Sequence, residues 1–203
     1  MSGASFDNSG VDQDRRRFLT ASASVVGAVG VAAAAVPFVS SMQPSEKAKT
    51  AGAPVEFNIS KVQPGMLATV KWRGKPVWIL HRTKEMLASL NEVESRLADP
   101  NSDVTSQQPP YAHNEYRSIK PAYLVLIGLC THLGCSPTFR PEHAPPDLGP
   151  NWVGGFFCPC HGSMFDLAGR VFKGVPAPTN MVVPPYEYLS DDVILIGKHG
   201  ETA

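Results

Sequence analysis

Two short blocks of this sequence combine residue types that bind iron or zinc. They read CTHLGC at residues 130–135 and CPCHGS at residues 158–163, and together they hold all four cysteines of the 203-residue chain and two of its six histidines. Each block thus supplies one cysteine, one histidine and one further cysteine. A [2Fe–2S] cluster with two thiolates on one iron and two imidazoles on the other needs two Cys and two His. The two cysteines left over, one per block, could close a disulfide between the blocks.

A zinc site is the main alternative for these donors. The six potential ligands exceed the four that one tetrahedral zinc takes and are too few for two closed sites. Neither block has the Cys-x2-Cys spacing that is common in zinc sites and in thioredoxin-type redox pairs. The donor set therefore favours an iron–sulfur cluster, with a membrane-tethered zinc-binding interaction module as the alternative from a different class.

The two blocks resemble the cluster-binding boxes of the Rieske iron–sulfur subunit of bacterial cytochrome bc complexes, which are ubiquinol–cytochrome c reductases. We call residues 130–135 the first box and residues 158–163 the second box. The resemblance implies that Cys130 and Cys158 bind one iron through their thiolates. It implies that His132 and His161 bind the other iron through their imidazoles. It also implies a disulfide between the remaining two cysteines, Cys135 and Cys160.

The resemblance extends to residues that would tune the cluster. Ser163 matches a serine that donates a hydrogen bond to a bridging sulfur. Phe165 stands where many high-potential relatives have a tyrosine, whose hydroxyl reaches the sulfur of a ligand cysteine. Because Phe cannot donate that bond, we expect a lower reduction potential here. Leu133 is expected to cover the cluster between the loops, with ordinary packing as the alternative. The sequence GVPAP at residues 174–178, the proline loop, is similar to a segment that braces the cluster in the family.

The resemblance implies electron transfer within a quinol–cytochrome c oxidoreductase, a translocase in which this chain is active only as a subunit. One electron would pass from quinol through the [2Fe–2S] cluster to a c-type cytochrome, coupled to proton release. The residues implied to contact quinol and accept its proton are His161 and His132, with Leu133 beside them. The implied partners are a cytochrome b subunit, a c-type cytochrome subunit, quinol and the membrane, in a dimeric complex.

Two other Rieske proteins are alternatives to this function. A Rieske subunit of another exported oxidoreductase, of the arsenite oxidase type, would also carry an export signal and the disulfide. The apolar span, the tether that follows it and the proline loop argue against that alternative. A Rieske oxygenase would need a further catalytic domain, which a chain of 203 residues cannot accommodate.

The N-terminus combines an export signal with a membrane span. Arg15 and Arg16, followed by Arg-Phe-Leu, resemble a twin-arginine signal. Residues 18–42 contain no charged side chain and are long enough to cross a hydrocarbon core of about 30 Å. Because the arginines precede the span, we expect a cytoplasmic N-terminus and a periplasmic domain, in a single-pass protein of the bacterial inner membrane. Cleavage in the alanine-rich residues 32–35 is the alternative, and the resemblance favours an uncleaved anchor.

The sequence is expected to divide into four segments. These are a cytoplasmic N-terminus (residues 1–17), a transmembrane anchor (18–41), a polar tether (42–54) and a Rieske domain (55–203), whose cluster-binding subdomain spans about 123–181. The resemblance implies that the tether is a hinge. The formal net charge of zero gives no reason to expect nucleic acid as a partner.

Short β-prone runs dominate the sequence after the tether. They lie at residues 55–59, 67–72, 76–81, 122–129, 155–157, 171–172 and 193–197. Residues 83–97 predict a helix instead, because apolar residues recur there at helical spacing and Thr83 can cap its start. Residues 99–118 and the proline-rich residues 136–153 predict loops. The predicted fold is mostly β, a Rieske-type antiparallel β-sandwich with a small cluster-binding subdomain, plus one N-terminal transmembrane helix.

Overall fold

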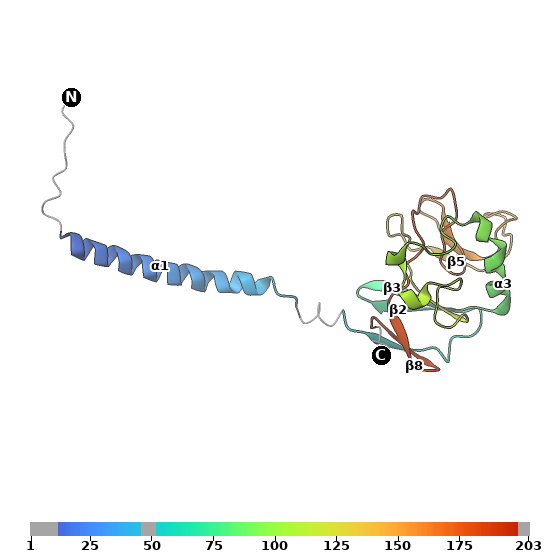
Figure 1. The fold of residues 1–203 in the computed structure, drawn as a ribbon, viewed down its shortest axis with the longest axis horizontal. Coiled ribbons are helices and arrows are strands. Elements are labelled where there is room, and N and C mark those ends of the chain that lie inside the picture. The colour runs from blue at the N-terminus through green and yellow to red at the C-terminus, as the bar shows by residue number, and fades with distance from the viewer. Residues whose placement is uncertain (1–11, 46–51, 199–203) are drawn as a thin grey trace, which may run out of the picture. The chain divides into compact units, whose positions relative to one another are not determined.

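The structure is a computed structural model that describes residues 12–45 and 52–198. The chain separates into two units, Met1–Lys49 and Thr50–Ala203, whose described parts are drawn in Figure 1. The expected tether at residues 42–54 falls partly outside the described residues. The two units are considered separately below.

The described part of the first unit is one long helix, α1 (Gln13–Ser41). Its N-terminus is capped by Asp12, whose side chain accepts hydrogen bonds from the backbone N–H groups of Asp14 and Arg15. Its 29 residues extend about 43 Å at the usual helical rise. The helix continues for four residues beyond Pro37. By length and composition α1 is able to cross a membrane.

The described part of the second unit contains three antiparallel sheets of three strands each. The first sheet has the order β1-β9-β8, the second β2-β3-β4 and the third β5-β6-β7. The strand bounds are β1 (Val55–Asn58), β2 (Leu67–Trp72), β3 (Lys75–His81), β4 (Tyr123–Ile127), β5 (Thr138–Arg140), β6 (Gly155–Cys158), β7 (Ser163–Phe165), β8 (Tyr186–Ser190) and β9 (Val193–Ile196).

The core lies around β3 and β4, which pair from Val77↔Ile127 to His81↔Tyr123. Both strands carry consecutive buried apolar side chains rather than alternating ones, as expected for strands covered on both faces. The same buried cluster includes the thiols of both boxes, Cys130 and Cys158, and the aromatic residues Phe156 and Phe165 of the third sheet. The two boxes are therefore built on the main core of the unit.

The predicted strands at residues 67–72, 76–81 and 193–197 are confirmed to within one residue. The predicted helix at 83–97 is too long: α3 runs over Lys84–Glu92, capped by Thr83, and a 3-10 turn follows at Glu94–Arg96. The predicted strand at 171–172 is wrong, because those residues form only isolated bridges, one of them between Phe172 and Leu97. The predicted loop at 136–153 contains strand β5, which pairs with β6.

Candidate metal centre

The two boxes form loops of the same design. In the first box, the backbone N–H of Cys130 donates to the carbonyl of Cys135 at 2.7 Å, and the N–H of Gly134 donates to the carbonyl of Cys130 at 2.9 Å. In the second box, Cys158 and Ser163 face each other across β6 and β7, and the N–H of Gly162 donates to the carbonyl of Cys158 at 2.9 Å. Each loop therefore starts at a cysteine and folds back on that cysteine's own carbonyl.

Glycine is required at the fifth position of both loops. Gly134 has φ +80° and Gly162 has φ +75°, a left-handed conformation that side chains with a Cβ disfavour. These left-handed residues turn the chain so that the third and fourth positions point away from the core. The histidines occupy those positions: His132 is third in its loop and His161 is fourth.

The two cysteines that start the loops are free and buried, with exposed fractions of 3% for Cys130 and 1% for Cys158. Burial raises the pKa of the Cys158 thiol, and the neighbouring Cys130 thiol adds to the rise. The backbone N–H groups of Cys160 and His161 hydrogen-bond to Cys158 and act in the opposite direction. An iron ion at this position would deprotonate the thiol outright, and these N–H groups would then stabilise the thiolate.

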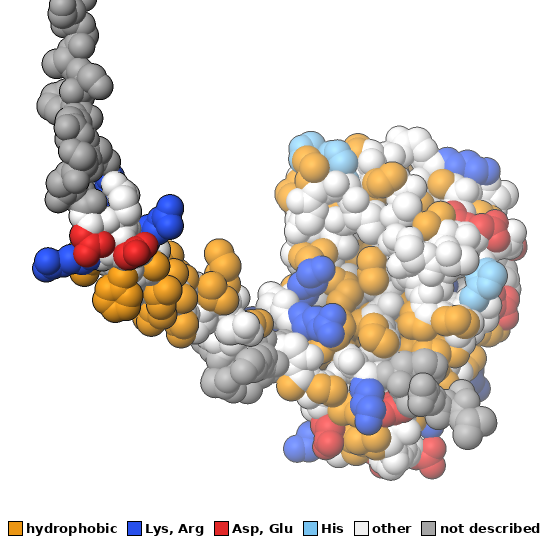
Figure 2. Space-filling view, turned by 60° about the vertical axis from the view of Figure 1, so that its left-hand side comes forward, with side chains coloured by type: hydrophobic (Ala, Val, Ile, Leu, Met, Phe, Trp, Pro, Cys, Tyr) orange, Lys and Arg blue, Asp and Glu red, His pale blue; other side chains and the backbone are white. Residues whose placement is uncertain are grey.

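The two imidazoles lie side by side at the outer end of the loops. The ring centroids of His132 and His161 are 4.8 Å apart, and the ring planes are nearly perpendicular at 84°. His161 is exposed and His132 is partly exposed, in contrast to the buried thiols. Figure 2 shows histidine side chains beside hydrophobic ones at one end of the larger unit. The site thus has a buried sulfur side and an exposed nitrogen side.

A disulfide joins the two loops. Cys135 of the first box is bonded to Cys160 of the second, as the resemblance implied. The sulfur atoms of this bridge and of Cys158 all lie within 4.8 Å of one another. Because both bridge sulfurs are bonded to each other, they are not free to bind a metal. The bridge therefore fixes the spacing of the two loops directly beside the free thiols.

The proline loop and Thr179, the residue directly after it, are hydrogen-bonded to the two boxes. The backbone N–H of Ala177 donates to the hydroxyl oxygen of Ser163 at 3.1 Å. From the first box, the hydroxyl of Thr131 donates to the carbonyl of Thr179, just after the loop, at 2.7 Å. The residues around 177–179 therefore tie the first and second boxes together on a further side of the site.

The other expected tuning residues lie in contrasting environments. Ser163, the last residue of the second box, and Phe165 are fully buried on β7. Leu133 has an exposed fraction of 72% at the tip of the first box, so this side chain is not packed into the core. The role of Leu133 as a cover for the cluster stays a prediction.

The sequence analysis missed Thr131 and three buried arginines. Thr131 could have been recognised from the sequence, since it is a hydrogen-bonding residue inside the first box. Arg82, Arg117 and Arg170 have exposed fractions of 2%, 0% and 3%. No motif marks them in the sequence, and arginine is ordinarily exposed.

The donor set fits a two-histidine [2Fe–2S] cluster. Two free buried thiols and two adjacent imidazoles remain after the disulfide has taken the other two cysteines. Four donors would also satisfy one zinc ion. The exposed imidazoles and the buried thiols divide the site into two halves, however, as expected for two irons with different ligand pairs.

Comparison with known proteins agrees with this donor set. The family model "Ubiquitinol-cytochrome C reductase Fe-S subunit TAT signal" matches residues 6–45, and the model "Rieske [2Fe-2S] domain" matches residues 97–187. The second match includes both boxes and the proline loop.

Curated relatives match over nearly the whole chain. The ubiquinol–cytochrome c reductase iron–sulfur subunit of Allochromatium vinosum is 64% identical over 93% of this chain and 91% of its own length. The corresponding subunit of Blastochloris viridis is 43% identical over 90% of this chain and 92% of its own length. These matches establish that this chain belongs to the family of ubiquinol–cytochrome c reductase iron–sulfur subunits and carries a Rieske-type [2Fe–2S] domain.

Proposed function

We propose that this subunit takes one electron from quinol and passes it to a c-type cytochrome, with release of a proton. The observation that carries the proposal is the division of the site into two buried thiols and two adjacent, outward-lying imidazoles. A redox centre that exchanges electrons with two partners needs one accessible face and one protected face. The exposed histidines and Leu133 would supply the accessible face.

Four residues would hold the cluster. Cys130 and Cys158 would bind one iron through sulfur, and His132 and His161 would bind the other through an imidazole nitrogen. When bound, a Rieske cluster accepts and returns one electron at a potential between roughly −150 and +300 mV, well above plant-type clusters with four cysteine ligands. The disulfide and the residues around 177–179 would keep the two ligand loops at a fixed spacing.

The imidazoles would also handle the proton. An imidazole that binds iron through one nitrogen carries a proton on the other, and once that proton is lost this nitrogen can accept a hydrogen bond from a quinol hydroxyl. His161, the more exposed of the two, is the better placed for this contact, with His132 beside it. Uptake of an electron makes the site more negative, which raises the pKa of the imidazole and favours transfer of the quinol proton to it.

The partners follow from the same reaction. The chain would receive quinol in contact with a cytochrome b subunit and deliver the electron to a c-type cytochrome subunit, within a dimeric complex. The exposed Leu133 would enter an apolar surface of the cytochrome b subunit next to the quinol, because it offers a large unpacked side chain beside the histidines.

The location follows from the N-terminal segment. Residues 1–17 with the paired arginines would remain in the cytoplasm, and residues 18–41 would cross the bacterial inner membrane as an uncleaved anchor. Residues 42–54 would form the tether, and the Rieske domain, residues 55–203, would lie in the periplasm. Twin-arginine export suits such a domain because the cluster can be inserted before transport, whereas the disulfide needs an oxidising compartment.

The pH dependence of the reduction potential tests the proposed coupling. The full chain, loaded with iron and held in detergent, would be titrated between pH 5 and pH 11. We expect a constant potential at low pH and then a fall of up to about 59 mV per pH unit, because the reduced form holds the imidazole proton more tightly. A potential that stays constant over the whole range would contradict the role of the histidines as proton acceptors.

A further inference from the structure

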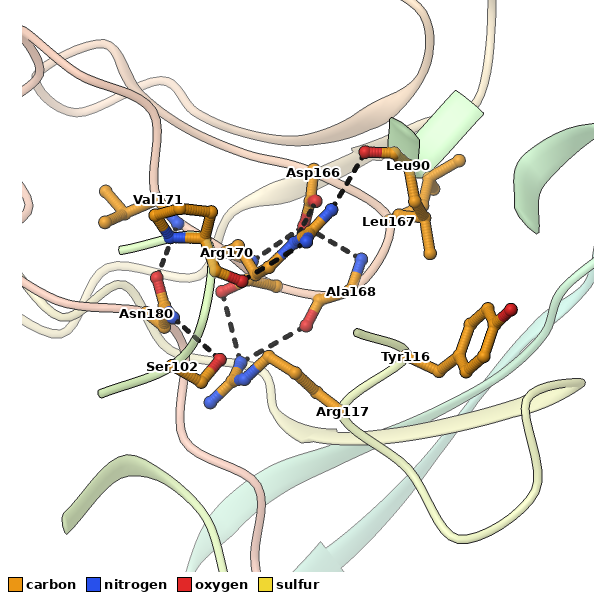
Figure 3. A network of polar contacts seen from close by, with 12 residues as sticks. Leu90, Ser102, Tyr116, Arg117, Asp166, Leu167, Ala168, Arg170, Val171 and Asn180 are labelled. Atoms are coloured by element: carbon orange, nitrogen blue, oxygen red, sulfur yellow. Dashed lines mark hydrogen bonds and ion pairs between the residues drawn. The ribbon is translucent and has the colours of Figure 1, made fainter. Parts of the chain in front are cut away.

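Three buried arginines surround the turn that follows the second box. Arg82 lies just after β3, Arg117 in the long segment between α3 and β4, and Arg170 in the turn itself. Figure 3 shows Arg117 and Arg170 on either side of the backbone of residues 166–170. This turn begins directly after β7, the strand that carries Ser163 and Phe165. The arginines thus bind the turn that follows the strand carrying Ser163 and Phe165.

The hydrogen bonds of Arg117 within the described residues all go to neutral groups. One terminal nitrogen donates to the carbonyls of Ala168 and Gly169, at 3.2 and 3.3 Å. The other donates to the carbonyl of Gln107 and to the side-chain oxygen of Gln108, at 3.3 and 2.8 Å. Its Nε has no hydrogen-bond partner within the described part of the chain. This fully buried guanidinium therefore has no carboxylate bound to it among the described residues.

Arg82 has the same kind of environment. Its guanidinium donates to the carbonyl of Leu167 at 3.1 Å and to the hydroxyl of Ser118 at 2.8 Å. It also donates to the carbonyls of Pro121 and Tyr116. Two buried arginines thus bind carbonyls of residues 167–169 without forming an ion pair in the described chain.

Arg170 is the one arginine of the three with an ion-pair partner among the described residues. Its Nε donates to Asp166 at 2.7 Å, and both side chains are almost completely buried. Asp166 also accepts hydrogen bonds from the backbone N–H groups of Ala168 and Arg170. A second carboxylate, the half-buried Asp99, faces Arg117 electrostatically and lies near Asn180. Among the described residues, the carboxylates that act on Arg82 and Arg117 are Asp166, which is already paired with Arg170, and Asp99 for Arg117 alone. This leaves a surplus of positive charge on Arg82 and Arg117.

The surplus persists at neutral pH. Burial lowers the pKa of both Arg82 and Arg117 to about 10, so both remain charged. Burying unpaired charge opposes folding, since the ions lose their hydration. A second charge of opposite sign nearby would offset that cost. Reduction of a metal centre above this turn supplies such a charge, because it adds one electron.

We propose that Arg82 and Arg117 are positioning residues that raise the reduction potential of the iron–sulfur centre through their buried positive charge. The inference rests on the ligand set proposed above. In this account, the arginines partly offset the absence of a hydroxyl at Phe165. They also hold the turn after β7 by donating hydrogen bonds to its carbonyls. If this were their whole role, the reduction potential would not depend on their charge.

The size of the effect follows from distance and dielectric constant. An extended strand rises about 3.3 Å per residue, so Asp166 lies at most about 10 Å along the backbone from Ser163. For a separation of roughly 12 Å and an effective dielectric constant of about 20, one unit charge changes a one-electron equilibrium about tenfold. A tenfold change corresponds to about 59 mV for a one-electron couple. We therefore expect removal of one arginine charge to lower the potential by roughly that amount.

The test compares charge-removing and charge-keeping variants of the iron-loaded full chain at pH 6. Arg117→Gln removes the charge, whereas Arg117→Lys keeps it and loses the planar fork. Burial lowers the pKa of a lysine at this position as well, and pH 6 favours its charged form. Asp99→Asn removes a half-buried anion and leaves all three arginines in place. Arg140→Gln is the matched control, since Arg140 lies in the 136–153 segment and pairs with Glu142 and Asp147.

In Arg117→Gln, we expect the equilibrium between the oxidised and reduced centre to shift about tenfold toward the oxidised form. Arg117→Lys and Arg140→Gln should leave the reduction potential almost unchanged, and Asp99→Asn should raise it. Equal shifts in Arg117→Gln and Arg117→Lys would reduce the arginines to a mechanical role and overturn the proposal. If Arg117→Gln does not fold, Asp99→Asn decides: an unchanged potential there overturns it. Failure of the ligand set itself would appear differently, as a wild-type chain that binds no iron.

Discussion

The backbone N–H of Ala177 donates a hydrogen bond to the hydroxyl oxygen of Ser163, 3.1 Å away, at a position where Ser163 is fully buried. Since this contact uses a lone pair of the hydroxyl oxygen, the hydroxyl hydrogen is left to donate elsewhere. The proline loop thus orients Ser163 as a donor at the end of the second box.

Replacing Ser163 should therefore lower the reduction potential. Ser163→Ala removes a donor that stabilises the more negative, reduced centre. A typical hydrogen bond of about 1 kcal/mol corresponds to roughly 40 mV for one electron. The potential would be measured by redox titration of the iron-loaded chain, with Ser136→Ala, an exposed serine of the neighbouring loop, as control. A potential equal to that of the wild type would show that Ser163 does not donate to the centre.

Phe165→Tyr should change the potential in the opposite direction. The substitution adds one hydroxyl to a fully buried ring on β7. If that hydroxyl donates to a ligand sulfur, the potential should rise by roughly 40 mV, again from about 1 kcal/mol. Phe139→Tyr, on β5 at the other edge of the same sheet, controls for the added oxygen. No rise in Phe165→Tyr would refute the explanation of a lowered potential in this chain.

The disulfide should stabilise the domain measurably. Cys135 and Cys160 are separated by 25 residues, and a cross-link of that span reduces the entropy of the unfolded chain by an amount worth about 3 kcal/mol. Replacing both cysteines with serine should lower the free energy of unfolding by about that amount and speed the loss of iron. Urea titration followed by far-ultraviolet circular dichroism and by visible absorbance would measure both effects. Unchanged unfolding and iron retention would mean that the bridge is dispensable.

The ion pair in the 136–153 segment should make stability depend on acid pH. Arg140 binds Asp147 through two nitrogens, at 2.7 and 2.9 Å, and holds the pKa of Asp147 below its ordinary value of 3.8. The stabilisation is therefore present above that value and lost as the pH falls through the lower folded-state pKa. Thermal unfolding of Asp147→Asn should show a lower midpoint than wild type at pH 6, and the difference should vanish near pH 2. A difference that is independent of pH would rule out the ion pair as its cause.

Much of the site was predictable because its chemistry is concentrated in two short boxes. The long apolar run before the first box became β4, and the β3 prediction was correct for the same reason: buried strands with consecutive apolar residues are easily recognised. The disulfide followed from the resemblance and is present.

The rest could not be read from local sequence because long-range contacts determine it. Strand β5 has three residues in a proline-rich segment and exists through its pairing with β6. Residues 171–172 are β-prone, but the N–H of Val171 donates to the side-chain oxygen of Asn180 and the two residues form only isolated bridges. The arginines are buried only because carbonyls from distant segments, such as Leu167 for Arg82, converge on them.

The most direct test of the central claim is electron paramagnetic resonance of the purified, reduced full chain, together with metal analysis. A centre held by Cys130, Cys158, His132 and His161 predicts two irons per chain and a rhombic signal with an average g value below 2. The signal should be lost in Cys158→Ser. A protein with stoichiometric zinc, no iron and no signal would contradict the account.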